Sequence, residues 1–238
     1  MLSMIKLTES DKEGVKKMYN PVILISTGRI PGARSVRRQQ SELYGQCLAA
    51  AGGLGVLYSS GDPNAAAARC DGLLLSGGGD LHPSRLGSAA AENQCRSVDP
   101  VRDAEEAALF EAFYRRGKPI FGICRGMQAI NIFMGGSLRT HIEGHSDCCH
   151  TLRFPIPSAM PLHIARAVNS YHHQAVDRVA SSLCAAACAP DGVIEAIFHP
   201  RVPILGVQWH PERMVPPFCE DVSGENHTPL FSWLCEHC

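Results

Sequence analysis

One cysteine of this chain lies in a sequence setting that favours nucleophilic chemistry. The run Pro119–Gln128 (PIFGICRGMQ) is a short apolar stretch that ends in Gly122-x-Cys124-x-Gly126 and leads into a helix pattern. Glycines two residues on either side permit a sharp strand-to-helix turn, the nucleophile elbow. Such a turn exposes the central thiol at the top of the sheet, where the N-terminus of the next helix favours a thiolate. A plain turn with a buried cysteine fits the same short pattern.

A second segment offers the base that a cysteine nucleophile needs. Gly206–Glu212 (GVQWHPE) ends an apolar strand in His210, and Glu212 follows two residues later. The imidazole could take the thiol proton and return it to a leaving amine, while the carboxylate fixes the tautomer of the ring. A chance histidine and glutamate at an exposed strand end also fit this segment.

A glycine turn offers donors for the negative charge that develops on a substrate oxygen. Leu73–Asp80 (LLLSGGGD) is an apolar strand followed by three glycines. The backbone N–H groups of Gly78 or Gly79, with that of Arg125 just after the cysteine, could form an oxyanion hole. A simple tight turn is the alternative. Phosphate binding is weakly supported, because no Gly-Lys-Ser/Thr or G-x-G-x-x-G frame surrounds the glycines.

The elements that must position these residues alternate between strands and helices. Asp99 as N-cap, Pro100 at the first helical position and Gly117 at the end mark the clearest helix. Residues 27–38 are interpreted as a Gly/Arg-rich loop. The other expected elements are strands at 21–26, 54–58, 73–76, 119–123, 193–198 and 204–209 and helices at 40–51 and 229–235.

This alternation predicts an α/β fold, a three-layer α/β/α sandwich with a mostly parallel central sheet. We expect residues 20–238 to form a single domain and residues 1–19 an N-terminal extension. The glycine turn and Cys124 both follow strands, and open α/β sheets bind their ligands at the carboxyl ends of strands.

Composition limits the partners and the compartment. The net charge is -1, so we expect no nucleic acid partner, and no apolar run approaches the ~20 residues of a membrane span. The first residues lack the apolar region of a secretion signal. Eleven cysteines at irregular spacing favour free thiols in a reducing compartment, which predicts a cytoplasmic protein. The oligomeric state cannot be read from the sequence, and a homo-oligomer is compatible with it.

One short segment contains metal-binding residue types. His145, Cys148, Cys149 and His150 could in principle hold an ion. Zinc would require a second well-spaced pair of ligands, and none is evident. We therefore predict no metal site and no cofactor.

Together and in this order, the three segments resemble the class I (triad) glutamine amidotransferase family, over about residues 20–215. Finer motifs are similar to its gamma-glutamyl-gamma-aminobutyrate hydrolase branch, which is peptidase C26-like. Those motifs lie at 78–83, 99–106, 124–131, 168–174 and 189–196. The resemblance implies a flavodoxin-like fold and a free-standing hydrolase that cuts a gamma-glutamyl amide to glutamate plus an amine, through a gamma-glutamyl thioester.

The resemblance also implies roles for individual residues. Cys124 would be the nucleophile, His210 the base and acid, and Glu212 its orienter. Gly78 or Gly79, with Arg125, would supply the oxyanion donors. The glutamyl moiety would contact Gln128 and the stretch Tyr171, His172, His173 and Gln174. The implied partner is a small-molecule gamma-glutamyl substrate.

The amine remains open. The family commonly has an acidic residue where His82 stands and an aromatic where Leu86 stands, which leaves the leaving group undecided. A polyglutamyl tail would require a basic cleft, which the arginines near the first loop, at 29, 34, 37 and 38, could offer. Alternatively, these arginines are solvated surface charges. Two other functions fit: a glutaminase subunit that delivers ammonia to a separate synthetase, or a non-catalytic gamma-glutamyl ligand-binding protein.

Overall fold

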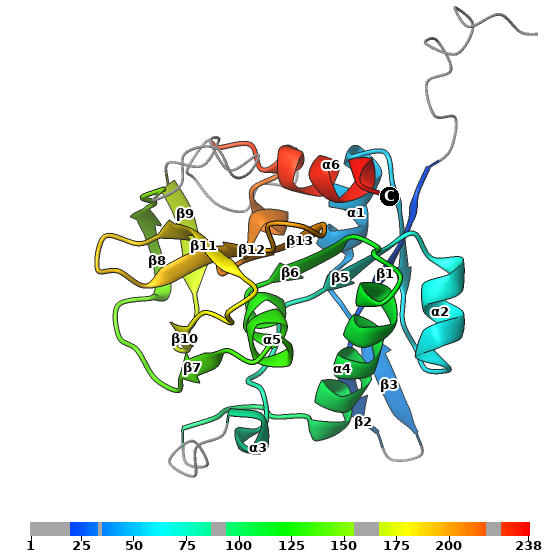
Figure 1. The fold of residues 1–238 in the computed structure, drawn as a ribbon, viewed down its shortest axis with the longest axis horizontal. Helices are drawn as coiled ribbons and strands as arrows, with labels where there is room; N and C mark the ends of the chain where they lie inside the picture. The colour runs from blue at the N-terminus through cyan, green and yellow to red at the C-terminus, as the bar shows by residue number, and fades with distance from the viewer. Residues whose placement is uncertain (1–19, 33–34, 87–93, 155–166, 218–224) are drawn as a thin grey trace, which may run out of the picture.

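The structure is a computed structural model that describes residues 20–32, 35–86, 94–154, 167–217 and 225–238. The expected extension at residues 1–19 lies outside the described residues. The central sheet has the strand order β4-β1-β5-β6-β13-β12-β10-β7, and β11 pairs with β12 (Figure 1). Its parallel part comprises β4 (Leu54–Leu57), β1 (Val22–Ile25), β5 (Gly72–Leu75), β6 (Ile120–Ile123) and β13 (Ile204–Val207).

Antiparallel strands extend this sheet beyond β13. They are β12 (Ile194–Phe198), β10 (Ala175–Arg178), β7 (Ser137–Arg139) and β11 (Cys184–Cys188). β12 and β13, which fall within the strands expected at 193–198 and 204–209, pair antiparallel. A separate pair, β8 (Ser146–Thr151) and β9 (Ala167–Tyr171), lies beside β11 and β12 at one end of the fold (Figure 1).

Helices cover both faces of the sheet, as the sequence predicts. Side chains alternate along a strand, so Ile23 and Ile25 pack on one face and Leu24 on the other. The first face is covered by α1 (Glu42–Ala50) and α6 (Thr228–Glu236), and the second by α2 (Pro63–Arg69), α4 (Pro100–Tyr114) and α5 (Arg125–Phe133). Two short helices, α3 (Pro83–Leu86) and η4 (Pro211–Arg213), also lie in the described ranges. The three-layer α/β/α sandwich is thereby confirmed.

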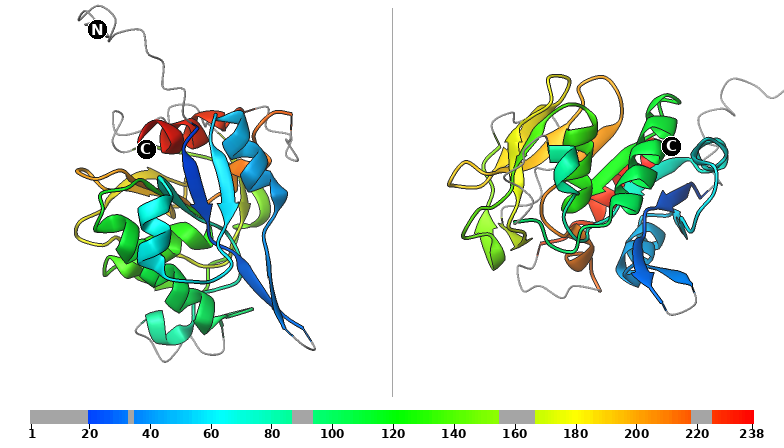
Figure 2. Two further views of the ribbon diagram at one scale, coloured as in Figure 1. Left: turned by 90° about the vertical axis from the view of Figure 1, so that its right-hand side faces the viewer. Right: turned by 90° about the horizontal axis from the view of Figure 1, so that it is seen from below.

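Residues 28–31 and 36–39 pair as antiparallel strands, so the expectation of a loop over 27–38 is wrong. β2 (Gly28–Pro31) pairs with β3 (Val36–Gln39), and the ribbon projects from the rest of the fold (Figure 2). Two arginines of the hairpin pair with carboxylates of the α4 region: Arg29 with Asp99 at 2.8 Å and Arg38 with Glu105 at 2.7 Å. Such tertiary contacts leave no trace in the local sequence pattern.

The elbow helix α5 packs very closely on the sheet. A Cβ added at Gly126 would lie 2.0 Å from the backbone oxygen of Leu75, and one at Gly122 would lie 2.6 Å from backbone atoms of Gly126. Only glycine fits at either position. The two glycines therefore let α5 start directly above β5 and β6.

We predict that Gly126→Ala destabilises the protein by about 3 kcal/mol, because the rigid backbone of β5 cannot yield to the new methyl group. Gly45→Ala, in α1, is the matched control. No atom lies within 4 Å of its added Cβ, and alanine in a helix interior should stabilise by about 0.5–1 kcal/mol. Urea denaturation measures both, and equal stabilities for the two variants would contradict the packing argument.

Candidate active site

The three predicted segments meet at one edge of the sheet. β5, β6 and β13 are neighbours, and their register pairs Leu75 with Gly122 and Gly122 with Gly206. The chain leaves β5 as the glycine turn, β6 as Cys124 and β13 as the segment that ends in His210. Because the strands are parallel, all three segments emerge at their carboxyl ends.

Cys124 has a backbone conformation that side-chain-bearing residues rarely adopt. Its φ is 52° and its ψ is -108°, and it is the N-cap of α5. Backbone strain of this kind costs about 1–3 kcal/mol and persists only where surrounding structure enforces it. Here the Cys124 N–H donates to the Val207 carbonyl at 2.8 Å, which ties the elbow to β13. The geometry is that of a nucleophile elbow.

His210 lies between a carboxylate and the thiol. Its Nδ1 is 2.7 Å from Oε1 of Glu212, and the ring also interacts with Cys124. Burial alone would lower the pKa of His210. The negative charges of Glu212 and Cys124 and their hydrogen bonds outweigh burial and raise the pKa to about 10. These interactions favour the protonated form of the ring beside Glu212 and the sulfur.

Neighbouring side chains fix the position of His210. Asn169 accepts a hydrogen bond from the His210 N–H at 2.8 Å and donates one to its carbonyl at 3.0 Å. The ring of Tyr171 meets the imidazole edge-on at 5.9 Å between centroids, and the guanidinium of Arg213 covers Tyr171 at 4.7 Å. The position of the imidazole is thus fixed through the His210 backbone and through a ring contact with Tyr171.

Tyr44 connects α1 to the glycine turn. Its hydroxyl accepts a hydrogen bond from the Gly77 N–H at 3.0 Å. Burial, followed by the charge of Glu212, raises the Tyr44 pKa well above its ordinary value, so the hydroxyl stays neutral. The Gly77 N–H is thus already bonded to Tyr44, and the predicted oxyanion donors of this turn remain Gly78 or Gly79.

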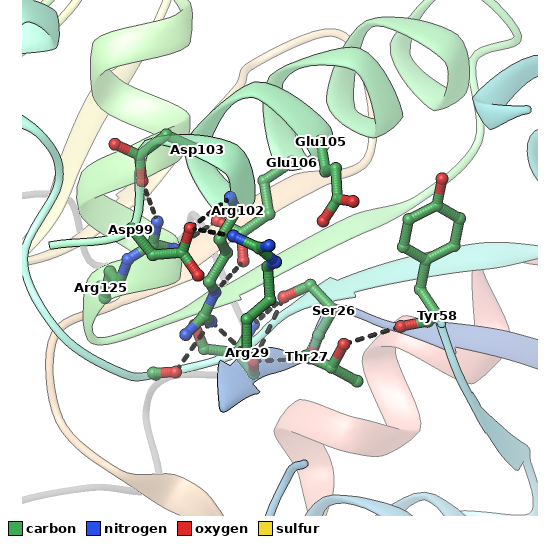
Figure 3. A network of polar contacts seen from close by, with 12 residues as sticks. Ser26, Thr27, Arg29, Tyr58, Asp99, Arg102, Asp103, Glu105, Glu106 and Arg125 are labelled. Atoms are coloured by element: carbon green, nitrogen blue, oxygen red, sulfur yellow. Dashed lines mark hydrogen bonds and ion pairs between the residues drawn. The ribbon is translucent and has the colours of Figure 1, made fainter. Parts of the chain in front are cut away.

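A buried arginine holds the other side of the turn (Figure 3). Arg102 Nη2 donates to the carbonyls of Ser76 at 3.1 Å and Gly77 at 2.9 Å. A Cβ at Gly78, whose φ is 152°, would lie 2.2 Å from Arg102 Nη1. The absence of a side chain at Gly78 therefore lets the guanidinium bind the turn directly.

Arg102 belongs to a buried network of four charges (Figure 3). Its Nε donates to Glu106 at 2.8 Å, and Arg125 pairs with both Glu106 and Asp103. Burial raises the pKa of Glu106, but the two guanidiniums outweigh burial and lower it to about 2. Asp103 also accepts the His82 N–H at 2.7 Å. The network links α4 to the elbow helix and to both ends of the glycine turn.

The backbone N–H and the side chain of Arg125 therefore have separate roles. The prediction concerns its backbone N–H, which follows Cys124 at the start of α5. Its side chain points instead into the charge network and is buried. The charge of Arg125 thus orders the elbow, while the N–H stays at the helix terminus.

The predicted pocket residues separate into different environments. Gln128 Nε2 donates to the Gln174 carbonyl and to Gln208 Oε1, each at 3.1 Å. His173 Nε2 lies 3.0 Å from Asp80, the residue that follows the glycine turn. His172 is buried, and its Nε2 faces Glu195 at 3.5 Å.

The sequence reasoning gave no role to several residues of this site. Gln208 Nε2 lies 3.6 Å from Cys124 Sγ, and Asn169 holds His210. The charged pattern at 99–106 marks the start of the helix that Asp99 caps and belongs to the family resemblance, but neither interpretation predicts the ion pairs of Arg102 and Glu106. Its spacing places Arg102 and Glu106 four residues apart on one helix face, a signal for an ion pair.

A cavity of about 270 Å³ lies beside the glycine turn, on the side of the β2–β3 hairpin. Arg29, Arg102 and Arg125 line it, but each is engaged by a carboxylate. Arg34 lies outside the described residues. The described arginines near this cavity are thus largely neutralised, which disfavours a broad basic cleft for a polyglutamyl tail.

The chain shares sequence with known proteins over most of its length. The Peptidase C26 profile matches residues 21–212. The chain is 30% identical over 227 residues to the gamma-glutamyl-gamma-aminobutyrate hydrolase PuuD of Escherichia coli, covering 82% of this chain and 87% of PuuD. It is 36% identical over 193 residues to Rv2859c of Mycobacterium tuberculosis, which is named as a glutamine amidotransferase. That match covers 71% of this chain and 61% of Rv2859c.

The fold also matches solved structures. A glutamine amidotransferase from Thermotoga maritima superposes with a TM-score of 0.57 at 12% identity, over 82% of this chain and 77% of that chain. The chain belongs to the Peptidase C26 family, a glutamine amidotransferase-like family whose members include hydrolases. None of the helices in the described ranges combines the length and the hydrophobicity that a membrane crossing requires.

The buried network predicts how stability responds to acid. Because the pKa of Glu106 is lower in the folded state, its contribution is complete above pH 4.5 and is lost as the pH falls toward about 2. Glu106→Gln should lose about 3–5 kcal/mol at neutral pH, because two buried guanidiniums lose a partner, and should lack this acid dependence. Glu111→Gln, an exposed i,i+4 partner of Arg115, is the control. Urea midpoints with parallel pH profiles in wild type and Glu106→Gln would contradict the assignment.

Proposed function

We propose that this protein is a cysteine hydrolase that cleaves a gamma-glutamyl amide, of the gamma-glutamyl-gamma-aminobutyrate type, to glutamate plus an amine. The observation that carries the proposal is the placement of His210 between Glu212 and Cys124, at the carboxyl ends of β6 and β13. Family membership supports an amide-cleaving reaction, and the name of PuuD suggests the substrate class.

The first half-reaction forms a thioester. The sulfur of Cys124, facing the imidazolium of His210, attacks the gamma-carbonyl carbon of the substrate. Negative charge moves to the carbonyl oxygen, which accepts hydrogen bonds from the N–H groups of Gly78 or Gly79 and of Arg125. The carbon–nitrogen bond then breaks, and His210 gives its proton to the departing amine. A gamma-glutamyl thioester on Cys124 remains.

The second half-reaction consumes water. His210, now neutral, takes a proton from a water molecule as its oxygen attacks the thioester carbonyl. The carbon–sulfur bond breaks, glutamate leaves, and the thiolate and imidazolium are restored. Gln128, Tyr171, His173 and Gln174 would bind the glutamyl part. The buried position of His172 gives it a supporting role behind that stretch.

The names of several relatives favour a second candidate, a glutaminase that supplies ammonia to a separate synthetase. Both candidates use the same thioester and differ in the leaving group and in dependence on a partner. Glutamine hydrolysis that stays weak in the isolated protein and rises with an added synthetase would favour this second function.

A panel of gamma-glutamyl amides tests the substrate class. Gamma-glutamyl conjugates of aminobutyrate, of polyamines and of amino acids, together with glutamine, are incubated with the protein and free amine is measured. We expect release by the isolated wild type and loss of at least about 10⁴-fold with Cys124→Ala, because no nucleophile remains. Cys149→Ser, which removes an exposed thiol, should keep full activity. Normal hydrolysis by Cys124→Ala would reject the proposal.

The raised pKa of His210 predicts the alkaline limit of activity. The imidazolium is needed to protonate the leaving amine, so kcat/KM should fall as the pH rises through about 10. Glu212→Gln removes a main cause of that raised pKa and should move the alkaline limb to lower pH, with reduced kcat. Glu236→Gln, exposed in α6, should change neither. An alkaline limb that stays in place in Glu212→Gln would show that Glu212 does not set the charge of His210.

A further inference from the structure

Four side chains to which the proposed mechanism assigns no contact with substrate converge between the small β8–β9 sheet and the main sheet. His145 precedes β8, His150 lies in β8, His172 follows β9, and Glu195 lies in β12. One donor atom from each lies within 4.8 Å of the corresponding atoms of the others. Glu195 is fully buried, and His145 and His172 are nearly so.

Each of the three imidazoles has an inner nitrogen that faces Glu195 and an outer nitrogen on the other side of the ring. Each outer nitrogen contacts an oxygen acceptor. Nε2 of His145 is 3.0 Å from Asp191, Nδ1 of His150 is 3.3 Å from the Thr151 carbonyl, and Nδ1 of His172 is 2.8 Å from the Gln174 carbonyl. A carbonyl or carboxylate only accepts, so the outer nitrogens carry the protons. In the neutral rings, the inner nitrogens then present lone pairs.

Those inner nitrogens all face one carboxylate oxygen. Glu195 Oε1 lies 3.4 Å from Nδ1 of His145, 3.4 Å from Nε2 of His150 and 3.5 Å from Nε2 of His172. Among the described residues, neither oxygen of Glu195 has a hydrogen-bond partner, nor do the inner nitrogens of His150 and His172. The hydroxyl of Ser170 is 3.4 Å from the inner nitrogen of His145 and donates to the His145 carbonyl at 2.8 Å.

Buried lone pairs that face a buried carboxylate require a positive charge among them. Extra protons on the rings are one source, but charge-assisted hydrogen bonds between nitrogen and oxygen are about 2.7–2.9 Å long. The observed separations of 3.4–3.5 Å are longer and nearly equal. These three separations are close to the edge of a tetrahedron around an ion with bonds of about 2.0–2.1 Å, which is about 3.3–3.4 Å, and all four donor atoms lie within 4.8 Å of one another.

We propose that His145, His150, His172 and Glu195 form a binding site for a divalent transition-metal ion of the zinc type. Imidazole and carboxylate ligands suit this class, and outer hydrogen bonds that fix the ring orientation are typical of metal-binding histidines. With four protein ligands the site is closed, which is the character of a structural ion. It joins β8 and β9 to β12.

This proposal revises the expectation of no metal site, which depended on the lack of a second pair of ligands near His145 and His150. The fold supplies that pair from His172 and Glu195, which the local spacing does not reveal. Cys148 is not part of the cluster, since its thiol donates to the Gly144 carbonyl at 3.2 Å.

Zinc binding tests the proposal, with every variant made in the Cys124→Ala background so that the catalytic cysteine cannot hold the ion. The protein is stripped with a chelator, titrated with Zn²⁺ against a competing indicator and analysed for metal content. We expect one Zn²⁺ per chain and binding weakened at least about 100-fold by Glu195→Gln or His150→Ala. His141→Ala, an exposed histidine on the same segment, should bind as the background does.

Asp191→Asn keeps the test decisive if a buried variant fails to fold. Asp191 is half-exposed and contacts only the outer nitrogen of His145 within the cluster, so its loss should weaken binding about 10–100-fold in a folded protein. Co²⁺ in place of Zn²⁺ should give the visible spectrum of a tetrahedral nitrogen and oxygen site without a thiolate charge-transfer band. No stoichiometric binding, unchanged affinity in His150→Ala and Asp191→Asn, or a thiolate band would each overturn the proposal.

Discussion

The hydrogen-bonded register of β5, β6 and β13 is the constraint from which the candidate active site follows. These three strands come from distant parts of the chain, yet they are neighbours in the parallel sheet. Their carboxyl ends carry the glycine turn, Cys124 and the segment of His210. A shift of one residue in any pair would turn the alternate side chains to the opposite face and separate the sulfur from the imidazole.

Buried ion pairs fix the glycine turn and the elbow that the sheet brings together. A flexible glycine turn could not hold oxyanion donors in place by itself, because glycine has the greatest conformational freedom. Arg102 binds the carbonyls of that turn, while Arg125 is fixed by Asp103 and Glu106. Burying four charges is costly unless they are mutually paired. The α4 helix therefore orders both the glycine turn and the elbow, although none of its side chains needs to touch substrate.

The sequence predicts best where local pattern and chemistry coincide. Local pattern directly predicts the elbow glycines, the N-cap at Asp99 and the His210–Glu212 spacing. The expected parallel sheet then implies that these segments meet at the carboxyl ends of its strands. Contacts between distant segments could not be read in this way. The hairpin at 28–39 is held partly by ion pairs to the α4 region, and the inward turn of His172 depends on Glu195 in a different sheet. Neither partner is encoded in the neighbouring residues.

Peptide mass spectrometry of protein quenched by acid during turnover of a gamma-glutamyl amide tests the central claim most directly. The account predicts a gamma-glutamyl adduct on the peptide that contains Cys124, formed in wild type and lost in His210→Ala. An adduct on a different cysteine, or turnover with no adduct while Cys124 stays unmodified under every quench time, would contradict it.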